Sequence, residues 1–287
     1  MEKFYELIPC STSNLGAGYD VFGLSLDLFL EIEAKFGQRC VTNLPRQLEN
    51  SLLNIESRLH EVLAIDKPKN LTWSLNSKIP IGKGLGSSAS LIVGLLKIIS
   101  SAHSIKLSDQ ELISLASSVE GHPDNVSPTI LGGLTISFTD SDGSFKAIRT
   151  SIKEFPKTIV FVPDFSLQTK KARQVVPMEV NISDAIKNIS QTNLILESLY
   201  SKRYDIMHYA IYDRLHENFR AKLIPGYLEV KDRIMRDGAY FASLSGAGPS
   251  IFSFVPDSFD PEGAVSKWKE FDVNAKYYIL NVYLNNK

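Results

Sequence analysis

The sequence predicts an α+β protein with two domains. Segments with strand-like and helix-like patterns are mixed along the chain without strict βα alternation, which favours α+β over a doubly wound parallel sheet. The 287 residues leave room for about two domains of roughly 100–200 residues each. A composition of 44% hydrophobic and 22% charged residues is ordinary for a globular protein. The segment 153–158 separates two such patterns, so we expect domains at 1–155 and 156–287.

The first half begins with a strand at 24–36, where apolar and polar residues partly alternate. Residues 54–65 have apolar positions at helical spacing and predict a helix. Alternation returns at 71–79 and predicts a strand that leads into a glycine-rich loop. The apolar run at 88–102 then predicts a buried helix.

The next helix is marked by its first residues. Ser108 and Glu111 are spaced as a capping box, so we expect a helix to begin at Ser108. Segment 131–138 contains a double-glycine turn and predicts a strand after it. The turn residues 140–143 then predict a hairpin into a further strand at 144–150.

The second half begins with an apolar strand at 158–163. One helix is bounded by Pro225 near its start and Gly238 just past its end, which is the usual asymmetry of these two residues. Residues 239–255 predict two strands around a second glycine-rich turn. The remaining predicted elements are helices at about 183–200, 203–213 and 261–270 and a strand at 275–284.

Charge and cysteine content argue against several classes of function. The net charge is −1 and no basic run stands out, so we expect neither nucleic-acid binding nor membrane binding. The two cysteines, Cys10 and Cys40, give no metal-ligand spacing and no disulfide framework, which favours a reducing compartment. The first residues lack the pattern of a signal peptide, and the longest apolar run is short and contains Lys97. We therefore expect a cytoplasmic protein.

The loop "PIGKGLGSSAS" (80–90) is the first candidate site. Its glycines are off by one from the dinucleotide fingerprint, and Gly86 is followed by serine instead of the lysine of a Walker loop. A protein-kinase loop would bring companion motifs that are missing from the sequence. What remains is a strand–loop–helix in which backbone N–H groups of residues 84–89 would favour an anion. A tight turn before a capped helix explains the loop equally well.

Three further segments resolve this ambiguity. They are "PCSTSNLGAGYDVFGLSLDL" (9–28), "EGHPDNVSPTILGGL" (120–134) and "LSGAGPSI" (244–251). With the loop, in this order, they resemble the GHMP kinases, and within that family the branch that phosphorylates homoserine. The resemblance spans essentially the whole chain. It implies an N-terminal domain like the second domain of ribosomal protein S5 and a ferredoxin-like C-terminal domain.

The resemblance implies binding of ATP and Mg²⁺. The ATP phosphate loop would be Pro80, Ile81, Gly82, Lys83, Gly84, Leu85, Gly86, Ser87, Ser88, Ala89 and Ser90. Ser88 and Glu120 would be the Mg²⁺ ligands, and oxygen ligands suit this ion. A carboxylate at a helix C-terminus is poorly placed against the helix dipole, which favours a functional role for Glu120 over a merely solvated one. Asn54 resembles an adenine-side asparagine, and Lys83 is expected to face solvent rather than a phosphate.

The resemblance also implies an amino-acid substrate, L-homoserine, in threonine biosynthesis. Arg173 and Arg220 would bind its carboxylate, with Thr169 nearby, since a guanidinium offers two donors to a carboxylate. Asn14 and Asp20 would bind its ammonium or hydroxyl group. In other contexts these residues would be surface arginines and a glycine turn with side-chain hydrogen bonds. The chain departs from the family pattern at Cys10 for Ala, Ala17 for Pro, Tyr19 for Phe, Val176 for Leu and Asn218 for Pro.

The catalytic residues implied are Asn125, beside the reacting hydroxyl, and Asp20. His122 and Asp124 are interpreted as structural, because phosphoryl transfer through a loose transition state depends on positioning and charge more than on a base. A homodimer is the expected assembly. Two alternatives remain: another small-molecule kinase of the same family, acting on mevalonate or a sugar, and a non-catalytic family member that binds metabolites.

Overall fold

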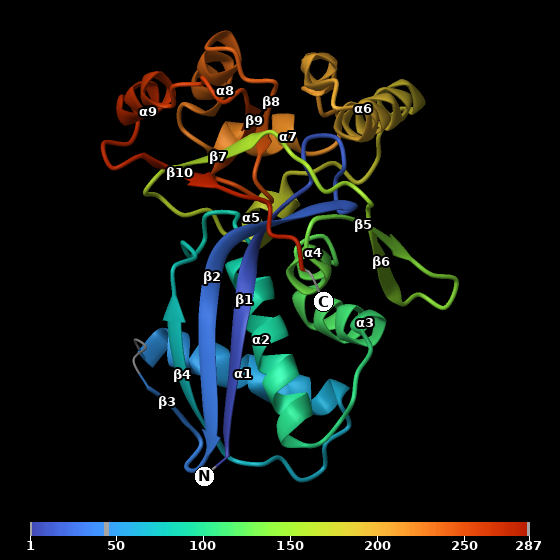
Figure 1. The fold of residues 1–287 in the computed structure, drawn as a ribbon, viewed down its shortest axis with the longest axis vertical. Helices are drawn as coiled ribbons and strands as arrows, with labels where there is room; N and C mark the ends of the chain where they lie inside the picture. Colours follow the sequence, from blue (N-terminus) through green and yellow to red (C-terminus); the bar gives the residue numbers. More distant parts are fainter. Residues whose placement is uncertain (1, 43–45, 286–287) are drawn as a thin grey trace.

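The computed structural model describes residues 2–42 and 46–285. Its elements form two bodies, each built around one β-sheet, and they are stacked along the long axis of the molecule (Figure 1). The sheet of the first body contains strands up to Arg149, and that of the second begins at Lys157. The mixture of helices and sheets confirms the α+β class.

The first sheet has the order β3-β4-β2-β5-β6, with β1 on the other edge of β2. Strand β2 is 15 residues long, so two different strands pair with the same edge of it. Its start pairs with β5 and its end pairs with β4. The strands of this sheet are β1 (Lys3–Ser13), β2 (Phe22–Phe36), β3 (Cys40–Thr42), β4 (Leu71–Ser77), β5 (Leu134–Thr139) and β6 (Phe145–Arg149).

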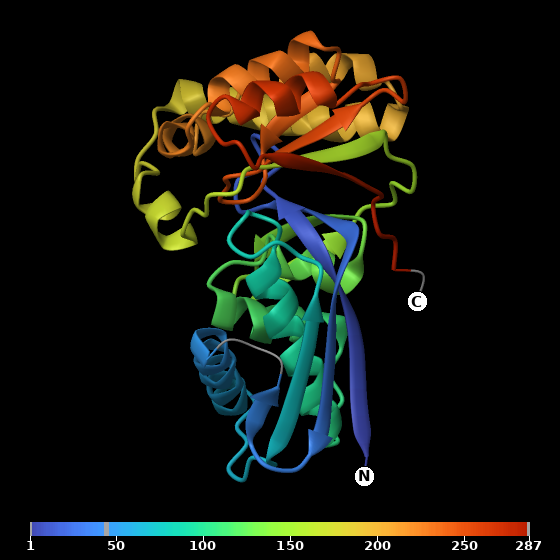
Figure 2. The ribbon, with the colours of Figure 1, turned by 90° about the vertical axis from the view of Figure 1, so that its left-hand side faces the viewer.

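Helices cover one face of this sheet (Figure 2). Helix α2 lies at the centre of the core, because it is apolar on nearly every side. Ser108 accepts the backbone N–H of Glu111 and the Glu111 carboxylate accepts the backbone N–H of Ser108, so the predicted capping box is confirmed. The helices here are α1 (Arg46–Val62), α2 (Ser87–Ala102), α3 (Asp109–Glu120) and α4 (Val126–Leu131).

The second sheet is antiparallel throughout, in the order β10-β7-β9-β8. The first of its strands lies between the third and the fourth, which is the ferredoxin-like order that the family resemblance implies. Strand β7 is buried on both faces: Ile159 and Phe161 pack with the helices above, while Val160 and Val162 join the core of the first body. The strands are β7 (Lys157–Val162), β8 (Phe241–Leu244), β9 (Ile251–Val255) and β10 (Lys276–Leu280).

The helices of the second body include an insertion between β7 and the crossover helix α8. The helical segment predicted at 203–213 is present as a shorter 3₁₀ helix, η1. 3₁₀ helices have i→i+3 hydrogen bonds and occur mostly as short connecting segments, which is the position that η1 has here. The helices are α5 (Thr169–Gln174), α6 (Ile182–Ser201), η1 (Tyr204–Ala210), α7 (Glu217–Arg220), η2 (Ala221–Leu223), α8 (Tyr227–Arg236) and α9 (Glu262–Lys269).

The chain returns to the first body after β10. The predicted strand at 275–284 ends at Leu280, and Val282 forms an isolated antiparallel bridge with Leu26 of β2. Asp27 accepts hydrogen bonds from the backbone and side-chain nitrogens of Asn281, both at 2.8 Å. The two bodies are therefore joined at two places.

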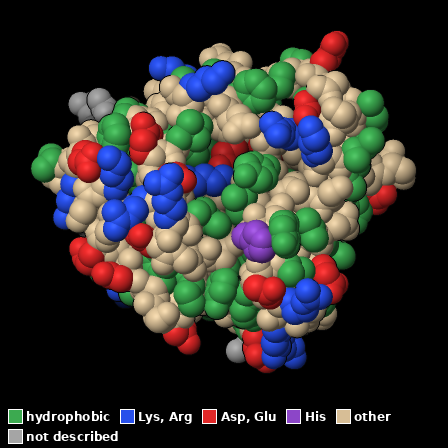
Figure 3. Space-filling model, turned by 90° about the horizontal axis from the view of Figure 1, so that it is seen from above, with side chains coloured by type: hydrophobic (Ala, Val, Ile, Leu, Met, Phe, Trp, Pro, Cys, Tyr) green, Lys and Arg blue, Asp and Glu red, His purple; other side chains and the backbone are tan. Residues whose placement is uncertain are grey.

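Two surface observations complete the fold. The end of the molecule formed by the second body carries both signs of charge interspersed with hydrophobic side chains (Figure 3). Within the described ranges 2–42 and 46–285, no helix combines the length and the apolar character needed to cross a bilayer.

Candidate active site at the junction of the two sheets

The glycine loop between β4 and α2 is held in a conformation that requires glycine. Gly82, Gly84 and Gly86 have φ angles of 70°, 76° and 65°, a region that side chains other than glycine rarely adopt. A Cβ on Gly84 would lie 2.1 Å from the carbonyl oxygen of Ser245, and one on Gly86 would lie 2.3 Å from Ser11 Oγ. The loop is thus pressed between β1 and the second glycine-rich turn.

Helix α2 begins at Ser87, and its N-cap, Gly86, has no side chain to accept the first N–H groups. The N-terminus of a helix offers free donors and a partial positive charge. This end of α2 therefore suits an anion such as a phosphate.

Lys83 does not face solvent, contrary to the expectation. Its side chain is buried, and its ammonium group donates hydrogen bonds to the carbonyl oxygens of Asp164 and Phe165, the latter at 2.7 Å. Burial lowers the pKa of Lys83. The lysine therefore connects the glycine loop to residues 164–165, just after β7. It does not line the cavity described below.

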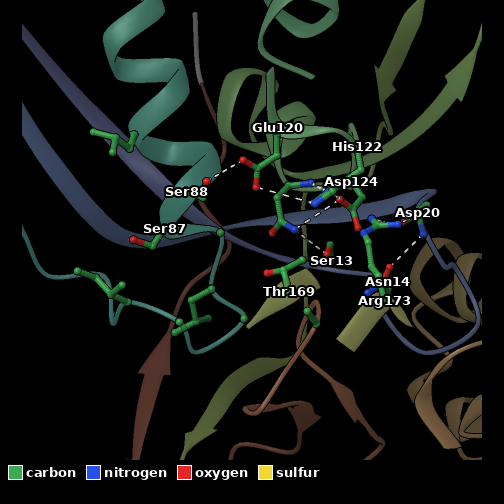
Figure 4. Close-up of a pocket in the computed structure, with 18 of the residues that line it drawn as sticks. Ser13, Asn14, Asp20, Ser87, Ser88, Glu120, His122, Asp124, Thr169 and Arg173 are labelled. Carbon is green, nitrogen blue, oxygen red and sulfur yellow. Dashed lines mark hydrogen bonds and ion pairs between the residues drawn. The ribbon is translucent and has the colours of Figure 1, made fainter. Parts of the chain in front are cut away.

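Ser88 and Glu120 meet across two helices (Figure 4). Ser88, in the first turn of α2, donates a hydrogen bond of 2.7 Å to Glu120, the last residue of α3. Burial raises the pKa of Glu120, against the opposing charge of His122 and the hydrogen bond from Ser88. A hydroxyl and a nearly buried carboxylate on one cavity wall fit the oxygen donor set that Mg²⁺ prefers.

His122 and Asp124 form a buried pair beside this carboxylate. His122 Nδ1 is hydrogen-bonded to the Asp124 carboxylate, and its Nε2 lies 3.9 Å from Glu120 Oε1. Burial disfavours the charged imidazole, but the charge and hydrogen bond of Asp124 outweigh it and raise the pKa of His122. Asp124 also accepts the backbone N–H of Asn125 at 2.9 Å, so the pair shapes the turn before α4.

The Asn125 side chain is held by strand β1. Its Nδ2 donates to Ser13 Oγ at 2.8 Å, and its Oδ1 accepts from Ser11 Oγ at 3.0 Å. The amide therefore connects the turn before α4 to β1, and it lines the cavity.

On the opposite wall, Asp20 and Arg173 form a two-pronged ion pair. The Arg173 nitrogens donate to the two Asp20 oxygens at 2.9 and 2.8 Å. Asn14 Oδ1 accepts the Asp20 backbone N–H at 3.0 Å, and Asn14 Nδ2 donates to the Gly246 carbonyl at 2.9 Å. Asn14 and Asp20 have φ angles of 72° and 56°, and such strain in non-glycine residues is typical of functional sites.

Arg220 approaches the same wall from the second body, at the end of α7. It is 2% exposed and donates to the carbonyl oxygens of Ala172 and Gly246 at 3.1 and 3.2 Å. Burial lowers its pKa, although a guanidinium stays charged under all ordinary conditions. Gly246 belongs to the second glycine-rich turn, so this turn packs against the same wall.

One cavity of about 270 Å³ brings these groups together. Its wall contains these predicted site residues: Asn14, Asp20, Ile81, Gly82, Gly84, Leu85, Gly86, Ser87, Ser88, Glu120, Asn125, Thr169, Arg173 and Arg220. It does not contain Asn54, Pro80, Lys83, Ala89 or Ser90. Asn54 is exposed on α1, and Ser51 and Ile55 line the cavity instead.

Sequence reasoning missed Ser51, Ile55 and Ser13. Ser51 and Ile55 are four residues apart, so they share one face of a helix. The sequence would have indicated this pair by its four-residue spacing if the helix had been predicted to begin before residue 54. Ser13 lies in a strand that the sequence did not predict.

Comparison with known proteins gives two family matches. The model described as "GHMP kinases N terminal domain" matches residues 50–133, and "GHMP kinases C terminal" matches residues 195–274. A homoserine kinase of Clostridium beijerinckii is 33% identical over 290 residues, which cover 97% of this chain and 95% of the relative. One of Prochlorococcus marinus is 34% identical and covers 98% and 94%.

Solved structures agree. A homoserine kinase from Cytophaga hutchinsonii superposes with a TM-score of 0.81 at 25% identity, covering 99% of this chain and 96% of that one. The mevalonate kinase of Methanococcus jannaschii has a TM-score of 0.69 at 19% identity and covers 98% of each chain. At that identity the second likeness concerns the fold alone.

Proposed function

The chain belongs to the GHMP kinases, and from this premise we propose that it transfers the γ-phosphoryl group of ATP to the side-chain hydroxyl of L-homoserine. The observation that carries the proposal is the composition of the cavity. One wall offers a helix N-terminus and the Ser88–Glu120 pair, which suit a nucleotide phosphate and its metal ion. The other offers Asp20, Arg173 and Arg220, which suit an amino acid.

The triphosphate of ATP binds at the start of α2. The backbone N–H groups at this helix end face the phosphates, and the absence of side chains at Gly84 and Gly86 allows close approach. Ser88 and Glu120 would hold Mg²⁺, which would neutralise charge on the phosphate oxygens. The nucleoside end extends toward α1, where Ser51 and Ile55 line the cavity.

L-Homoserine binds as a zwitterion at the Asp20–Arg173 pair. Without substrate, Asp20 satisfies both nitrogens of Arg173. A zwitterion supplies a carboxylate to Arg173 and Arg220 and an ammonium to Asp20, so every charge keeps a partner. A ligand with only a carboxylate would leave Asp20 unpaired, which costs free energy in a partly buried site. The pair therefore selects amino acids over simple hydroxy acids.

The reaction forms a bond between the substrate hydroxyl oxygen and the γ-phosphorus and breaks the bond to the β-γ bridging oxygen of ATP. The products are O-phospho-L-homoserine, ADP and a proton. Asn125, fixed by Ser11 and Ser13, orients the hydroxyl, and no side chain is required to remove its proton early. His122 and Asp124 maintain the turn that carries Asn125.

A coupled assay of ADP release tests this proposal. Purified protein, ATP and Mg²⁺ are offered L-homoserine, mevalonate and galactose in parallel. We expect release of ADP with L-homoserine alone, and none when Mg²⁺ is removed by a chelator. Turnover of mevalonate or galactose instead would favour another activity of the same fold, and no turnover of any of the three would reject the proposal. Sedimentation analysis would test the expected homodimer, and cell fractionation the expected cytoplasmic location.

A further inference from the structure

Tyr19 lies between the two arginines of the substrate wall. Its hydroxyl oxygen accepts hydrogen bonds from Arg173 at 3.2 Å and from Arg220 at 3.4 Å. Among the residues that the structure describes, this oxygen is the one acceptor that the two guanidinium groups share. Arg173 comes from α5 and Arg220 from α7, so Tyr19 connects two elements of the insertion to a turn of the first body.

The ring of Tyr19 contributes as well as its hydroxyl. The guanidinium carbons of Arg173 and Arg220 lie 5.8 and 5.0 Å from its centroid, within range of attraction between a cation and an aromatic face. His216 stacks on the ring at 4.9 Å with an angle of 23°, and its Nδ1 lies 3.3 Å from Arg220. The ring is thus fixed in place, and so is the hydroxyl at its end.

The guanidinium groups of Arg173 and Arg220 carry like charges and repel each other. To bind one substrate carboxylate, both groups must nevertheless point toward the same position. Asp20 forms its ion pair with Arg173, while the carbonyl oxygens of Ala172 and Gly246 accept hydrogen bonds from Arg220. Because the Tyr19 hydroxyl is hydrogen-bonded to both guanidinium groups, it fixes their positions relative to each other. Burial raises the pKa of Tyr19, so the hydroxyl remains neutral at neutral pH and accepts both bonds.

We propose that Tyr19 is a positioning residue that sets the two guanidinium groups at the separation that one substrate carboxylate requires. This role depends on the hydroxyl, because a phenylalanine ring would keep the stacking and lose both hydrogen bonds. It is a property of this chain's own residue, since the related motif has Phe at this position. The inference rests on the proposed function, which makes this wall the carboxylate site.

The test is the variant Tyr19→Phe, with Tyr277→Phe as a matched control. Tyr277 also makes one hydrogen bond through its hydroxyl, to Glu262 at 3.1 Å, in a part of the second body that does not line the cavity. For Tyr19→Phe we expect the KM for L-homoserine to rise at least about tenfold, because each of the two lost hydrogen bonds is made by a charged group. The KM for ATP and kcat should stay within about twofold, and Tyr277→Phe should change nothing.

Two analogues that compete with L-homoserine separate positioning from a general structural effect. L-2-Aminobutyrate keeps the ammonium and the carboxylate but lacks the hydroxyl, so its inhibition constant should rise by the same factor in Tyr19→Phe. 3-Aminopropan-1-ol keeps the ammonium and the hydroxyl but lacks the carboxylate, so its inhibition constant should not change. An equal loss of both inhibitors, or a parallel rise in the KM for ATP, would overturn the inference.

Different results would reject the proposed function and the role of Tyr19. If the unmodified enzyme does not phosphorylate L-homoserine, the proposed function fails and this inference fails with it. If the unmodified enzyme is active and Tyr19→Phe has the same KM for L-homoserine, only the role of Tyr19 is rejected.

Discussion

Replacing Gly84 by alanine tests whether contact between the two glycine-rich turns holds the phosphate loop. The added Cβ would lie 2.1 Å from the carbonyl oxygen of Ser245 and 3.0 Å from two backbone atoms of Gly248. These are backbone atoms, which cannot rotate away, so one turn must shift by about 1 Å to restore ordinary contact. The change therefore pushes the phosphate loop away from the second body.

The magnitude follows from two contributions to the free energy of unfolding. Alanine at a φ of 76° costs about 1 kcal/mol, the penalty for a left-handed backbone. Overpacking against fixed backbone costs about 1–3 kcal/mol more. We expect Gly84→Ala to lower the free energy of unfolding by about 2–4 kcal/mol. A shift of about 1 Å at a reacting group lowers kcat/KM about 100-fold.

Gly143 supplies the matched control. Its φ is 84°, and a Cβ there would meet nothing within 4 Å. Gly143→Ala should therefore cost about 1 kcal/mol from the backbone alone and leave kcat/KM for ATP unchanged. Both variants are measured by urea unfolding and by steady-state kinetics with varied ATP. Equal losses of stability, together with normal kinetics in Gly84→Ala, would refute the reasoning about the two turns.

Three further predictions concern the cavity walls. Asn125→Ala should reduce kcat far more than His122→Ala, measured by steady-state turnover; the reverse ranking would show that the imidazole takes part in the reaction. Because burial raises the pKa of Glu120, its ionised form costs stability, a cost that grows as pH rises and vanishes on protonation. Glu120→Gln should therefore raise the melting temperature at pH 8 without metal, more than at pH 5, while abolishing Mg²⁺-dependent turnover. Asp20→Asn should narrow the preference for L-homoserine over 4-hydroxybutyrate, measured as the ratio of kcat/KM values, and an unchanged ratio would argue against Asp20 as the ammonium partner.

Local signals in the sequence predicted many of the elements. The capping box at Ser108 and the apolar run of α2 were found because short-range hydrogen bonding and burial determine them. The helix between Pro225 and Gly238 appears as α8, with Gly226 at its N-cap. Each of the four family-like segments contributes residues to one cavity, because their loops and element ends meet at the junction of the two sheets.

Other features depend on contacts that no local pattern reveals. Strand β1 was missed because Ser11, Thr12 and Ser13 are polar and yet buried, satisfied by partners such as Asn125 and Ser245 from distant segments. Lys83 was expected in solvent because nothing nearby in the sequence points to carbonyl acceptors more than 80 residues away. The partnership of Asp20 with Arg173 spans 153 residues and likewise has no local signal.

The return of residues 281–283 to strand β2 restricts how this enzyme can open. Were the stretch between β6 and β7 the sole connection, the two bodies would swing about it as about a hinge. The bridge between Leu26 and Val282 and the pairing of Asn281 with Asp27 add a second attachment. A rotation of one body away from the other would strain either the β6–β7 connection or the contacts of residues 281–282 with β2. The two attachments therefore favour a fixed frame around the phosphate loop over a hinge opening between the two bodies.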